Sequence, residues 1–315
     1  MSLPTKLLDH TQYVMLYGTT PPRSGSSDER IITAATKLAE RVNRLVLDGL
    51  IVYDVQDESG RISVPRPFPF LPTMDSRLYA QRLSNLTGQC AITYKSIGQM
   101  TEDQWQQWLG EAGNEYGVRY LTPVGTPTSG TTPPPLPLSR AIELAADKRH
   151  DLMVGGIAIA ERHTDVRSES HRMVQKARNG CEFFISQAVY HAEPTQRLLK
   201  DYSLDCQKHE ISPKRVVLTF VPCGRPQTMA FLKWLGIAIP AKVEDSILSD
   251  ATPLTKSIQL CCANLRAILD QTAPWNVPLG VNVESVSIKK EEIDASFDLF
   301  CALQQVLKDY RPSGG

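Results

Sequence analysis

Residues 152–191 read LMVGGIAIAERHTDVRSESHRMVQKARNGCEFFISQAVYH, and this stretch predicts one complete strand–helix–strand unit. Met153–Ile159 is apolar and has the length of a buried strand. A polar loop and a basic helix follow, and Asn179-Gly180 ends that helix because both residue types are common at helix C-termini. Cys181–Ala188 is a second buried strand. Two buried strands joined by a helix indicate a parallel sheet, where ligands bind at the carboxyl ends of the strands.

The same alternation of apolar and helical segments extends along the whole chain. We predict strands at Tyr13–Tyr17, Leu50–Val55, Cys90–Tyr94, Arg119–Thr122, Met153–Ile159, Cys181–Ala188, Val216–Val221 and Gly280–Val286, each followed by a helix. Eight such units in 315 residues favour an α/β fold, a (β/α)₈ TIM barrel that forms a single domain over residues 1–315. An eight-stranded doubly wound sheet is the alternative. A dinucleotide-binding Rossmann domain is disfavoured, because no GxGxxG follows the first strand.

Composition limits the partners of the chain. The 34 basic and 34 acidic residues balance, so no basic excess predicts binding to nucleic acid or to an anionic membrane. No apolar run reaches the ~18 residues that cross a bilayer, and the N-terminus lacks the pattern of a signal peptide. The seven cysteines are scattered and form no CxxC, which predicts reduced thiols and no metal site. We expect a cytoplasmic protein with a small-molecule partner, and homo-oligomerisation stays open.

The polar residues just after the strands are the candidates for a ligand site. They are Thr19, Thr20, Asp54, Asp57, Glu58, Thr93, Gly125, Thr126, Glu161, His163, Gln187, Arg225 and Glu284. Threonines, carboxylates, one histidine and one glutamine suit a polar, ring-bearing small molecule. Gln187 interrupts an apolar run, so its amide needs partners from either the ligand or the barrel backbone. The two carboxylates of Asp57 and Glu58 have the alternative of being solvated loop charges.

Several of these segments resemble the methylenetetrahydrofolate reductase family, whose members are flavoprotein (β/α)₈ barrels. Ala160-Glu161-Arg162-His163-Thr164 is similar to the Pro-Glu-x-His-Pro loop of that family, and Ser186-Gln187 is similar to its Thr-Gln. The segments Gly236-Ile237-Ala238-Ile239-Pro240 and Pro21-Pro22-Arg23 resemble two further motifs of the family. The resemblance covers nearly the whole chain.

This resemblance implies a ligand for each group of candidates. Gln187 corresponds to the glutamine that holds the pterin ring of a reduced folate, and Thr20 and Tyr190 are expected beside the same substrate. The expected contacts to an FAD cofactor are Thr93, Gly125, Thr126, Glu161, His163 and Lys176. NAD(P)H is the expected hydride donor, either through FAD or directly without it, and the implied activity is an oxidoreductase acting on the one-carbon unit of the folate.

The sequence departs from the family at two carboxylates. The catalytic glutamate falls on Gly18, and the aspartate near the flavin falls on Thr126. General acid catalysis needs a proton donor within hydrogen-bond reach of the substrate. We therefore expect Asp57, Glu58 or Glu284 as the catalytic replacement. Two alternatives remain, namely folate-dependent methyl or one-carbon transfer without reduction, and a non-catalytic folate- or flavin-binding partner subunit.

Overall fold

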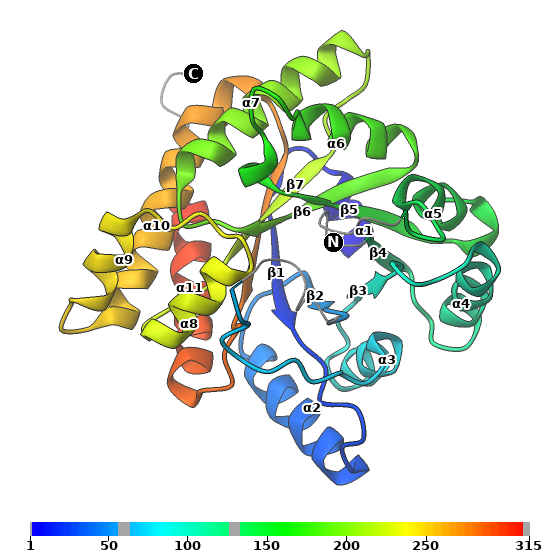
Figure 1. The fold of residues 1–315 in the computed structure, drawn as a ribbon, viewed down its shortest axis with the longest axis horizontal. Helices are drawn as coiled ribbons and strands as arrows, with labels where there is room; N and C mark the ends of the chain where they lie inside the picture. The colour runs from blue at the N-terminus through cyan, green and yellow to red at the C-terminus, as the bar shows by residue number, and fades with distance from the viewer. Residues whose placement is uncertain (1, 56–63, 126–132, 311–315) are drawn as a thin grey trace. The chain divides into compact units, whose positions relative to one another are not determined.

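The eight strands form a closed parallel barrel in chain order in the computed structural model, which describes residues 2–55, 64–125 and 133–310 (Figure 1). The predicted (β/α)₈ barrel is confirmed, and the open doubly wound sheet is excluded. The strands are β1 (Val14–Thr19), β2 (Gly49–Val52), β3 (Ala91–Ser96), β4 (Tyr120–Val124), β5 (Met153–Ala158), β6 (Cys181–Ala188), β7 (Arg215–Phe220) and β8 (Leu279–Glu284). Each lies within a few residues of its predicted position.

The helices alternate with the strands as predicted. They are α1 (Leu3–Leu8), α2 (Asp28–Val42), α3 (Ser76–Thr87), α4 (Glu102–Asn114), α5 (Leu138–Ala145), α6 (Glu169–Arg178), α7 (Ala192–Lys208), α8 (Pro226–Trp234), α9 (Ala241–Leu248), α10 (Pro253–Thr272) and α11 (Lys290–Asp309). Three short 3-10 helices are η1 (Lys148–His150), η2 (Ala160–Arg162) and η3 (Ala273–Trp275). Helix α1 was not expected from the sequence.

The chain divides into two compact units. The first contains Met1–Thr5, Leu16–Ile157 and Lys176–Phe183, and the second contains Lys6–Met15, Ala158–Gln175 and Phe184–Gly315. Helices α2–α5 belong to the first unit, and helices α7–α11 belong to the second. Organisation as a single domain over residues 1–315 stays a prediction.

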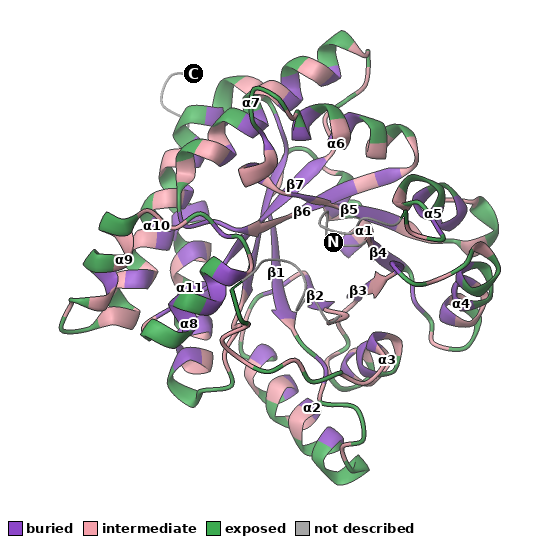
Figure 2. Ribbon diagram, viewed as in Figure 1, coloured by how far each residue is buried: buried purple, intermediate pink, exposed green. Residues whose placement is uncertain are grey.

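Strand sequence and burial agree throughout the barrel. All residues of β2 and of β7 are buried, because a parallel strand in a barrel is covered on both faces (Figure 2). In the first unit, Gly155 of β5 makes room for a neighbouring ring. A Cβ at this position would lie 2.3 Å from Cε2 of Phe183 and 2.8 Å from Oγ1 of Thr122. Gly155 therefore allows the Phe183 ring to fill the space beside β4.

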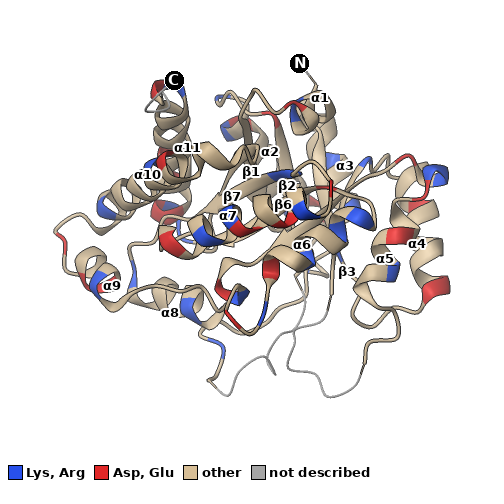
Figure 3. Cartoon of the chain, turned by 90° about the horizontal axis from the view of Figure 1, so that it is seen from above, with Lys and Arg blue, Asp and Glu red and all other residues tan. Residues whose placement is uncertain are grey.

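The surface helices of the first unit follow ordinary capping and charge rules. Thr101 and Gln104 form a reciprocal capping box at the start of α4. Arg140 of α5 donates to both carboxylate oxygens of Glu102 on α4, at 3.0 and 2.7 Å, and Figure 3 shows acidic and basic residues interspersed on these helices. Such exposed pairs add little stability, so this surface mainly keeps the unit solvated.

In the second unit, Arg215 closes the amino-terminal end of β7. Its side chain is fully buried. The guanidinium donates to the main-chain carbonyls of Leu7, Asp9 and Leu279. The strand was expected to begin at Val216, one residue later. Arg215 thus ties β7 and β8 to the segment that ends α1.

Candidate functional site

Gln187 lies near the end of β6 with one half of its amide fixed and the other half unpaired. Its Nε2 donates to the carbonyl oxygen of Leu235, just after α8, at 2.6 Å. Its Oε1 is buried and has no hydrogen-bond partner among the described residues. A buried acceptor without a partner costs about 1–3 kcal/mol. This oxygen is therefore one of the buried polar atoms of the second unit that are available to a ligand.

Glu161 follows β5 in η2 and contacts the same connection between α8 and α9. Its Oε1 accepts a hydrogen bond from the backbone N–H of Ala238 at 3.3 Å. Burial raises the pKa of the Glu161 carboxyl above its ordinary value of 4.5, and backbone donors oppose part of that shift. Glu161 and Gln187 thus hold the Leu235–Ala238 segment from two neighbouring strand ends.

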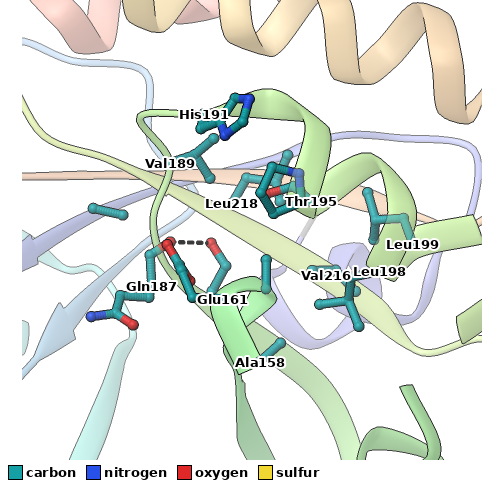
Figure 4. Close-up of a pocket in the computed structure, with 14 residues that line it drawn as sticks. Ala158, Glu161, Gln187, Val189, His191, Thr195, Leu198, Leu199, Val216 and Leu218 are labelled. Carbon is teal, nitrogen blue, oxygen red and sulfur yellow. Dashed lines mark hydrogen bonds between the residues drawn. The ribbon is translucent and has the colours of Figure 1, made fainter. Parts of the chain in front are cut away.

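Both side chains line a small cavity at the end of β6. Figure 4 shows Glu161 and Gln187 on one side of it, across from Leu198 and Leu199 of α7. The volume open to the centre of a water molecule is about 10 Å³. That is the space of roughly one water molecule, so a ring-bearing ligand cannot enter this cavity itself.

His163 braces the loop after β5 against α7. Its Nε2 lies 2.8 Å from Oδ2 of Asp201, and its main-chain carbonyl accepts from the guanidinium of Arg197. The imidazole is buried, and its Nδ1 has no partner in the described part of the chain. Asp201, on α7, was not among the candidates from the sequence. The expected flavin contact of His163 stays a prediction.

The other expected cofactor contacts lie in the first unit. Lys176 of α6 donates from Nζ to the carbonyl of Ile157 at 2.5 Å. Thr93 of β3 is fully buried, and its hydroxyl has no partner within the described ranges. Gly125 follows β4, where an added Cβ would be in ordinary contact with Leu138, and Thr126 lies outside the described residues. Their cofactor roles stay predictions.

The expected substrate and catalytic residues have different environments. Tyr190 is buried in an apolar cluster, where its hydroxyl donates to the carbonyl of Val221 at 2.6 Å and burial raises its pKa well above the ordinary value. Thr20 is exposed after β1, and Glu284 is the half-buried last residue of β8. Asp57 and Glu58 lie outside the described residues. The core position of Tyr190 indicates packing, and its substrate role stays a prediction.

One strand-end pair in the first unit includes a residue that sequence analysis missed. Asp54, after β2, accepts from the backbone N–H of Ser96 at 2.7 Å. Its Oδ2 lies 3.5 Å from Nζ of Lys95 on β3. Lys95 is the charged residue near the end of β3, and that signal was available in the sequence.

A second, larger cavity lies in the second unit at the starts of three helices. It is lined by residues 224–225 before α8, 252–255 at the start of α10, and 291–292 at the start of α11. Its volume is about 310 Å³, within the ~300–1,000 Å³ of small-molecule sites. Arg225 was a candidate from its position after β7, whereas Glu292 was not. Arg225 and Glu292 thus place a guanidinium and a carboxylate around one cavity.

Two other classes of site find no support. Among the described residues, no group of three or more His, Cys, Asp or Glu side chains could hold a metal ion. In the same ranges, no helix is long and apolar enough to cross a membrane.

The chain is similar in sequence and structure to one folate-binding protein. That structure is an uncharacterised protein from Clostridium thermocellum that binds two copies of 5-methyl-5,6,7,8-tetrahydrofolic acid. The sequences are 30% identical, the match covers 96% of this chain and 99% of the other, and the TM-score is 0.81. No family model and no curated protein matches the chain.

Two further solved structures are more distantly similar to the chain. They are dihydropteroate synthase from Xanthomonas albilineans, with 13% identity and a TM-score of 0.49, and 2,3-dimethylmalate lyase, with 12% identity and a TM-score of 0.46. The matches cover 98% and 97% of this chain, and 98% and 92% of the other chains. Likenesses this distant carry no argument about function.

Proposed function

The chain belongs to the family of the Clostridium thermocellum protein, and from this premise we propose that it binds a reduced folate, in two copies as that relative does. The observation that carries the proposal is the 30% identity over 96% of this chain and 99% of the relative. Gln187 is the proposed anchor of one pterin ring, with Glu161 beside it.

The chemistry of the ring suits these two side chains. A reduced pterin presents N–H donors and a carbonyl acceptor along one edge. The unpaired Oε1 of Gln187 accepts from such a donor, and its amide stays oriented because Nε2 is fixed on Leu235. The Glu161 carboxylate is a second acceptor near the same strand ends. Because the cavity behind them has room for only about one water molecule, we place the ring over the strand ends.

The proposed reaction is reduction of the folate one-carbon unit by NAD(P)H. A hydride leaves the nicotinamide and forms a C–H bond at the methylene carbon attached to N5. The bond from that carbon to N10 breaks, and N10 takes a proton from a general acid. Glu284, at the end of β8, is the candidate for this acid among the described residues. Asp57 and Glu58 are the two other candidates from the sequence. Unchanged turnover in a variant with alanine at all three positions would eliminate these candidates.

Two of the residues expected around FAD already have partners within the chain. The ammonium of Lys176 already lies on the carbonyl of Ile157, and the His163 Nε2 is paired with Asp201. A diphosphate needs donors that are free to neutralise its charge. We therefore propose that the hydride passes directly from NAD(P)H. A flavin spectrum that persists in the purified protein would contradict this.

Group transfer without reduction is the second candidate. Gly18 lies within β1 opposite Ile51 of β2, where the reductases that the chain resembles carry their catalytic glutamate. Oxidation of NADH or NADPH that depends on methylenetetrahydrofolate supports reduction. Tight folate binding without this oxidation, together with methyl transfer to an added acceptor, supports the second candidate.

Folate binding is tested by calorimetric titration with 5-methyltetrahydrofolate. In Gln187→Ala, one binding event should weaken at least tenfold, which corresponds to about 1.4 kcal/mol. Gln196→Ala is the matched control, because Gln196 also donates its amide to a main-chain carbonyl, that of Ala267 at 2.9 Å. Both variants lose a similar hydrogen bond, so only a ligand contact separates them. Equal affinities in the two variants would remove Gln187 from the site.

A further inference from the structure

The larger cavity has the polar groups and the rigidity of a ligand site. Glu292 is 1% exposed, and its position is fixed by two hydrogen bonds. Its Oε1 accepts from the backbone N–H of Gly224 at 3.3 Å, and its Oε2 accepts from the hydroxyl of Thr228 at 2.9 Å. Each carboxylate oxygen of Glu292 therefore already accepts one hydrogen bond from the protein.

Arg225 supplies the opposite charge at the edge of this cavity. Its side chain is exposed, and its guanidinium makes no ion pair with a carboxylate in the described part of the chain. Neither Arg225 nor Thr252 caps its helix with a side-chain hydrogen bond. The starts of α8 and α10 therefore add partial positive charge to the guanidinium.

The β7–α8 loop reaches the start of α10 because residue 224 is glycine. A Cβ on Gly224 would lie 2.7 Å from Cγ of Leu254 and 3.3 Å from its backbone nitrogen. This contact holds Arg225 and the apolar Leu254 side chain at the same cavity. Two glutamates (the exposed Glu291 and the buried Glu292), an arginine and an apolar wall thus line one cavity of about 310 Å³.

We propose that this cavity, between the starts of α8, α10 and α11, is the site of the second reduced folate, an inference that rests on the proposed function. A reduced pterin has adjacent N–H donors at its 2-amino group and N3, which a single carboxylate accepts as a pair. Glu292 takes that edge, and the ring packs on Leu254. Arg225 pairs with a carboxylate of the folate glutamate, for which its planar fork is suited.

The test is the number of 5-methyltetrahydrofolate molecules that the full chain binds in calorimetric titration. We expect two for the wild type and one for Arg225→Ala, with the remaining event unchanged. Arg266→Ala is the matched control, because Arg266 is an exposed arginine on α10 that does not line the cavity. Glu292→Gln should lose the same event, since an amide accepts through one oxygen alone.

The outcomes separate this inference from the proposed function. One molecule bound by the wild type and lost in Gln187→Ala would overturn the second site and leave the first. Two molecules bound by Arg225→Ala with unchanged affinities would also overturn it, because Arg225 is exposed and its loss leaves the fold intact. No binding by the wild type would overturn both. Loss of one event in Arg225→Ala, with both kept in Arg266→Ala, supports the inference.

Discussion

Two arginines ten positions apart, Arg215 and Arg225, have opposite environments. Arg215 is the first residue of β7, and Arg225 lies in the loop that follows this strand. Arg215 is buried, and three main-chain carbonyls satisfy its guanidinium. Arg225 is exposed at a cavity, and no carboxylate among the described residues pairs with it. The amino-terminal end of a barrel strand serves stability, and the carboxyl end serves ligands. The two ends of β7 differ in whether groups of the protein itself pair with the guanidinium.

The largest expected effect is the loss of stability when the buried arginine, Arg215, is replaced. Arg215→Ala leaves the carbonyls of Leu7, Asp9 and Leu279 without their donor, and it also opens a cavity. The free energy of unfolding should fall by about 4 kcal/mol. Urea denaturation measures this loss. Arg225→Ala is the control and should change stability by less than about 0.5 kcal/mol. Similar losses in the two variants would show that burial does not separate the two arginines.

An effect of intermediate size is expected at two buried threonines, which also differ in whether the protein provides a hydrogen-bond partner. Thr219 of β7 accepts from the side-chain amide of Asn282 on β8 at 3.3 Å, whereas the Thr93 hydroxyl has no partner among the described residues. Thr219→Val should therefore lower the free energy of unfolding by about 1–2 kcal/mol. Thr93→Val should raise it by up to about 1 kcal/mol, since valine keeps the shape and removes an unpaired hydroxyl. Thermal unfolding of both variants shows whether each substitution lowers or raises the free energy of unfolding. Loss of stability in Thr93→Val would mean that the protein satisfies its hydroxyl.

The smallest expected effect is a pH dependence at Glu161. Burial raises the pKa of this carboxyl above 4.5, so the folded chain holds the proton more tightly than the unfolded chain does. The stability contribution of Glu161 is therefore greatest below pH 4.5, falls as pH rises towards the folded-state pKa, and is level above it. Glu161→Gln lacks this titration.

The measurement compares urea midpoints of wild type and Glu161→Gln below pH 4.5 and at neutral pH. The variant should gain stability relative to wild type at the higher pH. A difference between the two proteins that does not change with pH would mean that the carboxyl titrates normally.

Sequence patterns predicted the barrel because continuous apolar runs such as β2 and β7 have one stable arrangement. They also pointed to Gln187 as a candidate, because a buried polar residue inside an apolar run needs a hydrogen-bond partner. They missed Arg215 because a charged residue at the start of a strand is usually solvated. Glu292 was missed for a related reason, since its partner Thr228 is 64 positions away. Long-range partners decide which polar groups are buried, and local pattern does not contain them.

The close approach of Gly155 and Phe183 restricts the order in which the barrel interior can evolve. An alanine at position 155 would put its Cβ 2.3 Å from the Phe183 ring, an overlap that no small shift relieves. Replacing Phe183 by a smaller residue leaves only a void, which a folded chain survives at reduced stability. A lineage can therefore pass through the smaller side chain first and fill position 155 afterwards. The reverse order is closed, so homologues with a larger residue at 155 should also lack the ring.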